Sequence, residues 1–105
     1  MKERIYTLSE EEYATLAEEI KERLNSPCYF SGTVEIEGRE GKTLRFTASL
    51  ILYRRHVADT TQYDVHDTIY AVVPVWWDFF CESEEGIIFD DFDFAEFRKH
   101  FIEEE

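Results

Sequence analysis

The chain has few of the residues that build disulfide-linked or metal-bound folds, with two cysteines, two prolines and four glycines among 105 residues. Two cysteines are too few for a disulfide scaffold or a cysteine-rich metal site. We expect Cys28 and Cys81 to be free thiols, and a single disulfide between strand ends is the alternative that geometry would decide. The glycines are scattered, so the sequence contains no glycine-rich phosphate loop.

Basic charge and long apolar runs are also scarce. The chain carries 24 acidic residues against 11 Lys and Arg, a net charge of −13, which argues against binding to phosphate backbones or anionic membranes. No apolar run approaches the roughly 20 residues of a transmembrane helix, and the N-terminal MKERIYTLSEEE lacks a signal-peptide core. We expect a cytoplasmic protein that binds neither membranes nor nucleic acid directly.

The residues that are present suit a folded domain. Hydrophobic residues make up 44% of the chain and aromatic residues 16%, which is enough to build a core at this length without a bound metal. No repeat, linker or low-complexity tract divides the sequence. We expect residues 1–105 to form a single α+β domain.

Two helices are signalled by their caps. Ser9 with Glu12 forms a capping box at the start of a helix over residues 9–24, and Pro27 follows its end. Asp93 with Glu96 repeats the capping pattern near the C-terminus. In both helices apolar residues recur at helical spacing. Hydrophobic staples are expected at each start, and the paired residues are Leu8 with Tyr13 and Phe92 with Phe97.

Alternating residues predict an antiparallel hairpin from residues 28–37 and 43–53. The register follows from parity, because apolar residues of both strands must lie on one face. A three-residue loop, Arg39 to Gly41, satisfies this condition and places Gly41 in the left-handed region. The same register sets Glu35 opposite Arg45, with Ile36 opposite Leu44 and Val34 opposite Phe46.

The alternation is lost over residues 54–67, which we expect to be a strand end and a polar loop. A third strand follows over residues 68–80, and a fourth, short strand over residues 87–89. Pro74 cannot donate to a strand ladder, so the third strand should lie at an edge or carry a bulge. The predicted fold is a three- to four-stranded antiparallel meander between an N-terminal and a C-terminal helix.

Both faces of this sheet contain large apolar residues. The inner face takes the even-numbered residues of the first two strands and, from the third, Ile69, Ala71, Val73, Val75, Trp77 and Phe79. The outer face is polar at one end and apolar at the other, where it is expected to carry Tyr29, Ile51, Tyr53, Tyr70, Val72, Pro74 and Trp76. Three alternatives would explain this: one helix covers each face, the outer face forms a homodimer, or it binds a different partner.

Catalytic and metal-binding patterns are weak in this sequence. His56 and His66 flank a loop that contains Asp59 and Asp64, with Asp67 beside it, but no metal-binding spacing joins them. Helix capping explains the acidic group Asp90, Asp91 and Asp93 better than a calcium loop, which needs a glycine and a later glutamate. Ser31, Ser49 and Cys81 occupy no nucleophile motif. We expect no enzyme activity, no metal and no cofactor.

Charge is distributed unevenly along the chain. Residues 78–105 carry eleven acidic and two basic side chains, whereas residues 38–66 carry five basic and three acidic ones. We predict a non-enzymatic protein–protein interaction or accessory protein, with self-association through the outer sheet face as one form of it. The alternative is an acidic inhibitor, either an immunity-type protein or a DNA mimic, that is steered to a basic partner.

Two segments carry a resemblance to a known group. AVVPVWWDF at residues 71–79 and FDDFDFAEFRK at residues 89–99 resemble small acidic proteins encoded in Bacteroidetes genomes, often on mobile elements. The resemblance spans most of the chain, and its motifs are structural rather than catalytic. It implies a cytoplasmic bacterial accessory protein and transfers no functional residue.

Overall fold

A computed structural model describes residues 5–58 and 65–102 of the chain. Two helices and four strands form the fold, with short 3₁₀ turns between β1 and β2 and after the second helix. In chain order the elements are α1 (Glu10–Glu22), β1 (Tyr29–Glu37), η1 (Arg39–Gly41), β2 (Thr43–Ala58), β3 (Val65–Ser83), β4 (Gly86–Ile88), α2 (Phe94–Arg98) and η2 (Lys99–Phe101). The predicted α+β class and the predicted order of elements are confirmed.

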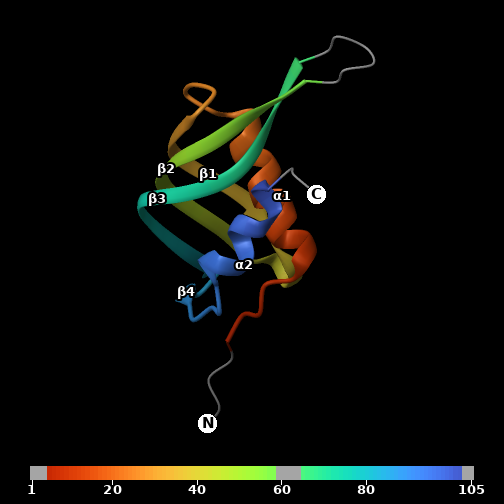
Figure 1. Ribbon diagram of the computed structural model, residues 1–105. Coiled ribbons are helices and arrows are strands. Elements are labelled where there is room, and N and C mark those ends of the chain that lie inside the picture. Colours follow the sequence, from red (N-terminus) through yellow and green to blue (C-terminus); the bar gives the residue numbers. More distant parts are fainter. Residues whose placement is uncertain (1–4, 59–64, 103–105) are drawn as a thin grey trace.

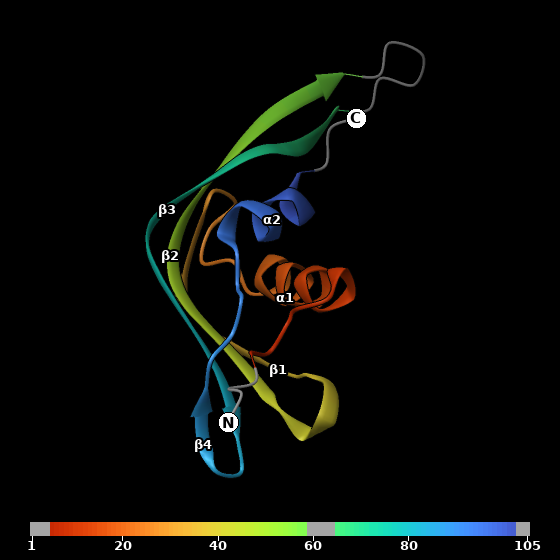
Figure 2. The same cartoon turned by 90° about the horizontal axis from the view of Figure 1, so that it is seen from below.

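The four strands form one antiparallel sheet in the order β1-β2-β3-β4 (Figure 1). The sheet is strongly bent, and both helices lie on its concave side (Figure 2). This arrangement excludes the alternative in which one helix covers each face. The convex face, which we call the outer face, is therefore left without a helix.

The β1–β2 hairpin has the predicted register. Glu35 pairs with Arg45, and the neighbouring apolar pairs are Ile36 with Leu44 and Val34 with Phe46. The Gly38 N–H donates to the Lys42 carbonyl at 2.8 Å, which closes the three-residue loop. Gly41 has φ 73°, the left-handed conformation that glycine adopts without steric cost. The length of the loop therefore determines which residues of β1 and β2 lie on the same face of the sheet.

The strand end expected within residues 54–67 is confirmed, but the third strand begins before the predicted residue 68. β2 continues to Ala58 and β3 begins at Val65, so these strands form a long hairpin that extends past the helices (Figure 2). The sequence of this extension is rich in polar residues and lacks the alternation that predicts a half-buried strand. The backbone register pairs His56 with Asp67 and Val57 with His66, and Asp59 and Asp64 lie outside the described residues.

Both helix starts follow the capping signals. Ser9 and Glu12 make a complete capping box at α1. At α2 the Asp93 carboxylate accepts from the Ala95 N–H at 2.9 Å, and the rings of Phe92 and Phe97 lie 5.3 Å apart as a staple. α1 ends at Glu22, two residues before the predicted end. In the described part of the chain, no helix is both long and apolar enough to cross a membrane.

An aromatic cluster fills the concave side of the sheet. Phe46 on β2 lies 4.9 Å from Phe97 of α2 and 5.5 Å from Phe92, measured between ring centroids. Tyr13 of α1 lies 6.3 Å from the same Phe97 ring. The fully buried side chains around them come from α1, β1, β2, β3 and η2, and include Leu16, Ile20, Phe30, Leu44, Leu50, Ile69 and Phe101. One core thus joins both helices to one sheet face.

Two β-bulges change which residues of β3 face this core. The register between β2 and β3 shifts at Ser49/Leu50 and again at Tyr53/Arg54, so one extra residue of β3 is inserted at each place. Between the shifts the parity of β3 is reversed. Val72 is consequently 2% exposed, whereas Val73 and Val75 are 45% and 62% exposed. The predicted outer positions of Val72 and Pro74 and the predicted inner positions of Ala71, Val73 and Val75 are corrected.

Pro74 lies beside the first bulge, where Leu50 is its partner on β2. The other edge of β3 is paired only over Cys81–Ser83, with β4. Pro74 therefore occupies an edge next to a bulge, as its missing N–H requires.

The bulges can be tested by truncating adjacent valines. Val72→Ala should lower the free energy of unfolding by about 2 kcal/mol, because it removes buried methyl groups and leaves a cavity. Val73→Ala should change it by less than about 1 kcal/mol, because this side chain lies on the outer face. Urea unfolding of both variants measures the difference, and equal losses would show that the parity of β3 is not reversed here.

Candidate functional site

The apolar half of the outer face is formed by three neighbouring strands. Tyr29, Ile51 and Val73 lie side by side in one row across β1, β2 and β3. The next row along the strands contains Trp76, and the row on the other side contains Tyr53 with Tyr70 beside it at the second bulge. We call these six residues the outer patch, and each is between 36% and 50% exposed.

Contacts within the outer patch hold its aromatic rings in place. The Tyr53 and Tyr70 rings lie 6.2 Å apart, and the Arg55 guanidinium carbon lies 4.9 Å from the Tyr70 centroid, a cation–π distance. Hydrogen bonds with Ser49 and Ser31 lower the pKa of Tyr29 from its ordinary value. Trp76 is 50% exposed and lies at the β3 edge of the patch.

The other half of the outer face is polar. Hydroxyl pairs bridge β1 and β2, with Ser31 Oγ 3.1 Å from Ser49 Oγ and Thr33 Oγ1 2.9 Å from Thr47 Oγ1. Beyond them Arg45 lies 2.6 Å from Glu35 and 3.5 Å from Glu82. The outer face is therefore divided along the strands into an apolar half and a charged half, as the alternation predicted.

Five of the six predicted interface residues belong to the outer patch, namely Tyr29, Ile51, Tyr53, Tyr70 and Trp76. Val72 is a core residue, and Val73 takes the outer position expected for it. The sequence contained a partial signal, because Pro74 indicated a bulge or an edge. Parity alone could not locate the inserted residues. The role of these residues as an interface stays a prediction.

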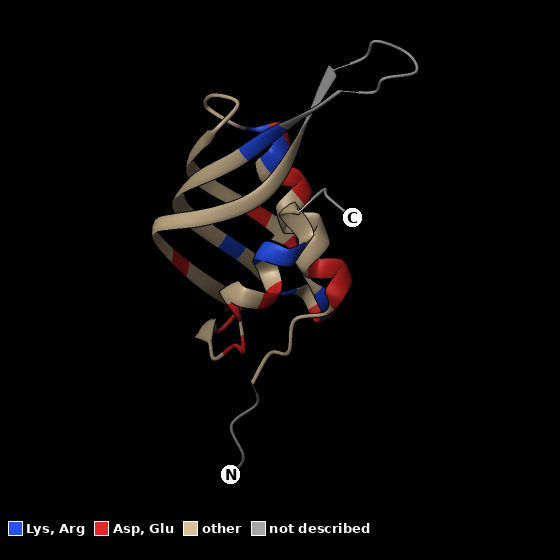
Figure 3. Cartoon of the chain, viewed as in Figure 1, with Lys and Arg blue, Asp and Glu red and all other residues tan. Residues whose placement is uncertain are grey.

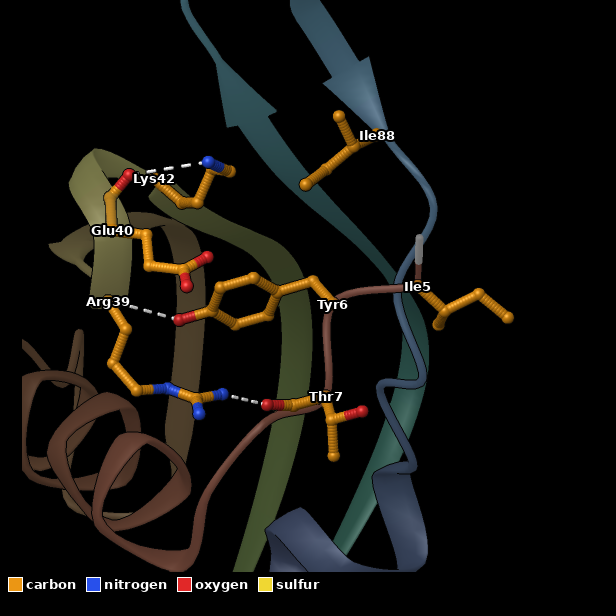
Figure 4. A pocket seen from close by; sticks show the side chains of 7 residues that line it. All are labelled: Ile5, Tyr6, Thr7, Arg39, Glu40, Lys42 and Ile88. Atoms are coloured by element: carbon orange, nitrogen blue, oxygen red, sulfur yellow. Dashed lines mark hydrogen bonds between the residues drawn. The ribbon is translucent and has the colours of Figure 1, made fainter. Parts of the chain in front are cut away.

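A concave region lies at the opposite end of the molecule from the outer patch. A shallow hollow of about 510 Å³ lies between the N-terminal segment, the η1 turn and β4 (Figure 4). Residues 5–7 run along this hollow, and Tyr6 bridges to residue 90 through its backbone. The Tyr6 hydroxyl donates to the Glu12 carboxylate and accepts from the Arg39 N–H at 2.8 Å.

Glu12 is the central anion of this cluster and is only 7% exposed. The Arg39 guanidinium lies 3.3 Å from Glu12 Oε1 and also donates to the Thr7 carbonyl. The Ser9 N–H donates to the same carboxylate at 2.9 Å. Burial opposes the charge, but hydrogen bonds from Tyr6, Ser9 and Arg39 outweigh it and lower the pKa of Glu12. Burial and the bond to Glu12 raise the pKa of Tyr6.

The hydrogen-bond partners within the cluster of Tyr6, Glu12 and Arg39 indicate its role. Its carboxylate stays ionised and its phenol stays neutral, and each accepts or donates to a neighbour within the cluster. The arrangement fastens the N-terminal segment to the η1 turn and to α1. The sequence revealed only the Ser9–Glu12 part, because Tyr6 and Arg39 reach Glu12 from distant positions in the chain. These contacts explain the cluster as one that stabilises the packing of the N-terminal segment against η1 and α1.

The other candidate polar residues also have structural partners. Asp91 accepts from the Leu8 N–H at 2.9 Å, Asp90 from the Phe92 N–H at 2.9 Å, and Asp93 caps α2. Burial raises the pKa of Asp90. Over residues 5–58 and 65–102, no group of three or more His, Cys, Asp or Glu side chains is arranged to hold a metal ion.

Both cysteines are free thiols, so the alternative of a disulfide is excluded in this structure. Cys28 is exposed, and its carbonyl accepts from the Leu52 N–H. Cys81 is buried, and its partner on β2 is Leu44, near the start of that strand. Burial raises the pKa of Cys81 to about 11, so its thiol is protonated and unreactive at neutral pH.

The charge on Glu12 should make stability depend on pH. A carboxyl whose pKa is lowered by folding adds stability above its unfolded pKa and loses it as the pH falls through its folded pKa. Glu12→Gln should therefore be less stable than the wild type near pH 7, and the difference should shrink below about pH 4. Urea unfolding across this pH range measures it, and an unchanged difference would contradict the assigned charge.

Gly38 should tolerate no side chain. A Cβ atom there would lie 2.6 Å from the Tyr6 hydroxyl, 3.0 Å from Glu12 Oε2 and 3.1 Å from a Leu44 side-chain carbon. Gly38→Ala should lower the free energy of unfolding by about 1–3 kcal/mol. Gly41→Asn is the matched control, because Cβ space is open there and asparagine tolerates a positive φ. Equal stabilities of the two variants would refute the close packing at Gly38.

The chain was compared with protein-family models, with curated proteins and with solved structures, and none of these comparisons found a match.

Proposed function

We propose that this protein is a non-enzymatic interaction protein that binds another protein surface through the outer patch. The observation that carries the proposal is the placement of both helices on the concave face, which leaves six large apolar side chains exposed together on the other. Single exposed apolar residues are common on proteins, but a contiguous group of this kind marks interaction surfaces.

The composition of the outer patch supports protein binding. Three tyrosines and one tryptophan provide large contact areas with few side-chain rotations to restrict, and these residue types dominate binding energy in known interfaces. Their rings are already held by neighbours on the sheet. A rigid sheet face loses little conformational entropy when it binds.

The charge around the outer patch differs from that of the whole molecule. Arg54 and Arg55 of β2 lie where the strand enters the long hairpin. Acidic residues gather at the first turn of α1 and before β4 (Figure 3). Arg55 contacts the Tyr70 ring and therefore borders the outer patch within a protein of net charge −13, whereas Arg54 pairs with the buried Ile69 and donates to the Pro27 carbonyl. This local charge favours partners with acidic groups beside an apolar surface.

We also propose a cytoplasmic location. Two free thiols, one of them exposed, suit a reducing compartment. The resemblance to small acidic proteins of Bacteroidetes stays a prediction and adds no role.

A second candidate function uses the acidic end. The bridge between Tyr6 and Asp90 brings the start of α1, with Glu10 and Glu11, to the same end of the molecule as the turn before β4, with Glu84 and Glu85. A concentration of one charge accelerates encounter with a basic partner. An acidic inhibitor, either an immunity-type protein or a DNA mimic, would bind through this end rather than through the outer patch.

Site-specific photo-crosslinking separates the two candidates. A photo-reactive phenylalanine analogue at Trp76 should crosslink to protein in the native cell, whereas the same analogue at Thr33, in the polar half of the outer face, should not. The analogue at Glu84 serves the second candidate, which requires crosslinks that disappear at high salt. Equal yields at Trp76 and Thr33 would refute binding through the outer patch.

A further inference from the structure

Both edges of the sheet are interrupted beside the outer patch. At the β1 edge, the Asn25 side chain accepts from the Ser31 N–H at 2.7 Å, and the Asn25 and Ser26 N–H groups donate to the Tyr29 carbonyl. At the β3 edge, Pro74 lacks an N–H and lies next to a bulge. Proteins use such devices against edge-to-edge pairing. Beside the outer patch, the exposed face is therefore better suited to association than the strand edges are.

We propose that the occupant of the outer patch is a second copy of this chain, packed face to face with its strands antiparallel to those of the first. This inference rests on the proposed function, because it requires the outer patch to bind protein. It adds the identity of the partner and the arrangement of the two sheets.

The area available suits a dimer of modest affinity. With aromatic side chains of about 150–250 Å² each, the exposed parts of the outer patch amount to roughly 500 Å² per copy. Two copies would bury about 1,000 Å², the lower limit for a specific interface. Because the sheet is bent (Figure 2), the contact is limited to the rows of the outer patch and one row on either side of them, which hold Arg55 and Asp78.

A two-fold axis between two facing sheets can run along the strands or across them. An axis along β2 would place each row opposite itself, so Arg55 would face Arg55 of the second copy. An axis across the strands, through the row of Ile51 and Val73, reverses the order of the rows. Arg55 then lies over the row of Thr47 and Asp78, where the exposed Asp78 carboxylate can pair with it.

The reversed arrangement also matches side-chain size. Trp76 shares its row with Ser49, and the row of Tyr53 contains Ala71 on β3. Reversal sets Trp76 opposite the small Ala71 of the second copy, with the Tyr53 and Tyr70 rings nearby. Ile51 and Val73 meet their own counterparts at the axis. Charge and size therefore both favour the axis across the strands.

Charge reversal tests this arrangement in the full chain, with sedimentation velocity over a concentration series measuring the monomer–dimer equilibrium. Arg55→Asp and Asp78→Arg should each weaken the dimer about tenfold, because the axis repeats the pair twice. The double variant should restore wild-type association. Arg23→Asp is the matched control, because it makes the same change of charge as Arg55→Asp but lies at the C-cap of α1 on the concave side (Figure 2), and it should leave association unchanged.

Three other results of the association experiment would each contradict the proposal. A dimer that tightens with the neutral variant Arg55→Gln has its axis along the strands, because that change removes the repulsion between two facing Arg55 side chains. A dimer that responds to neither reversal uses another surface. A wild-type chain that stays monomeric up to about 1 mM, well above the range of specific association, is no homodimer. If Trp76 still crosslinks to a different protein in the cell, that monomer leaves the proposed function intact, and if it crosslinks to nothing, both fail.

Discussion

The ring of Phe46 lies where three parts of the chain meet. It projects from β2, lies 4.9 Å from Phe97 on α2, and lies 5.5 Å from Phe92 in the segment that leads into that helix. α1 joins the same group through Tyr13. Two short helices can each bury only a narrow apolar stripe, so both are used on one face of the sheet. The exposure of the outer face is a direct consequence of this packing.

Local rules predicted the elements that depend on neighbours in the sequence. The β1–β2 register followed from parity because a three-residue loop fixes it, and the capping box at Ser9 placed the start of α1. The same parity failed on β3, since each bulge inserts one residue and reverses the faces beyond it. Val72 and Val73 exchanged faces for this reason. The length of the hairpin beyond Tyr53 was not predicted, because its sequence does not alternate between apolar and polar residues.

Long-range contacts could not be predicted from the sequence, for a different reason. Glu12 was recognised as part of a capping box, but its partners Tyr6 and Arg39 come from the N-terminal segment and the η1 turn. Nothing in their spacing indicates that they meet. The outer patch was predictable because it is built from strand neighbours, and five of its six residues were identified from alternation. The partner that binds to the outer patch is a proposal, and it rests on the exposure of this face.

One face of the sheet is buried by both helices, and the other carries exposed apolar side chains (Figure 2). Paramagnetic relaxation by a soluble probe, read from the methyl signals of the dilute monomer by nuclear magnetic resonance, tests it directly. Ile51 and Val73 methyls should relax strongly, while Val72 and Leu52 methyls should be protected. Protection of Ile51 and Val73 in the monomer would show that the chain covers its own outer face, and would contradict the account.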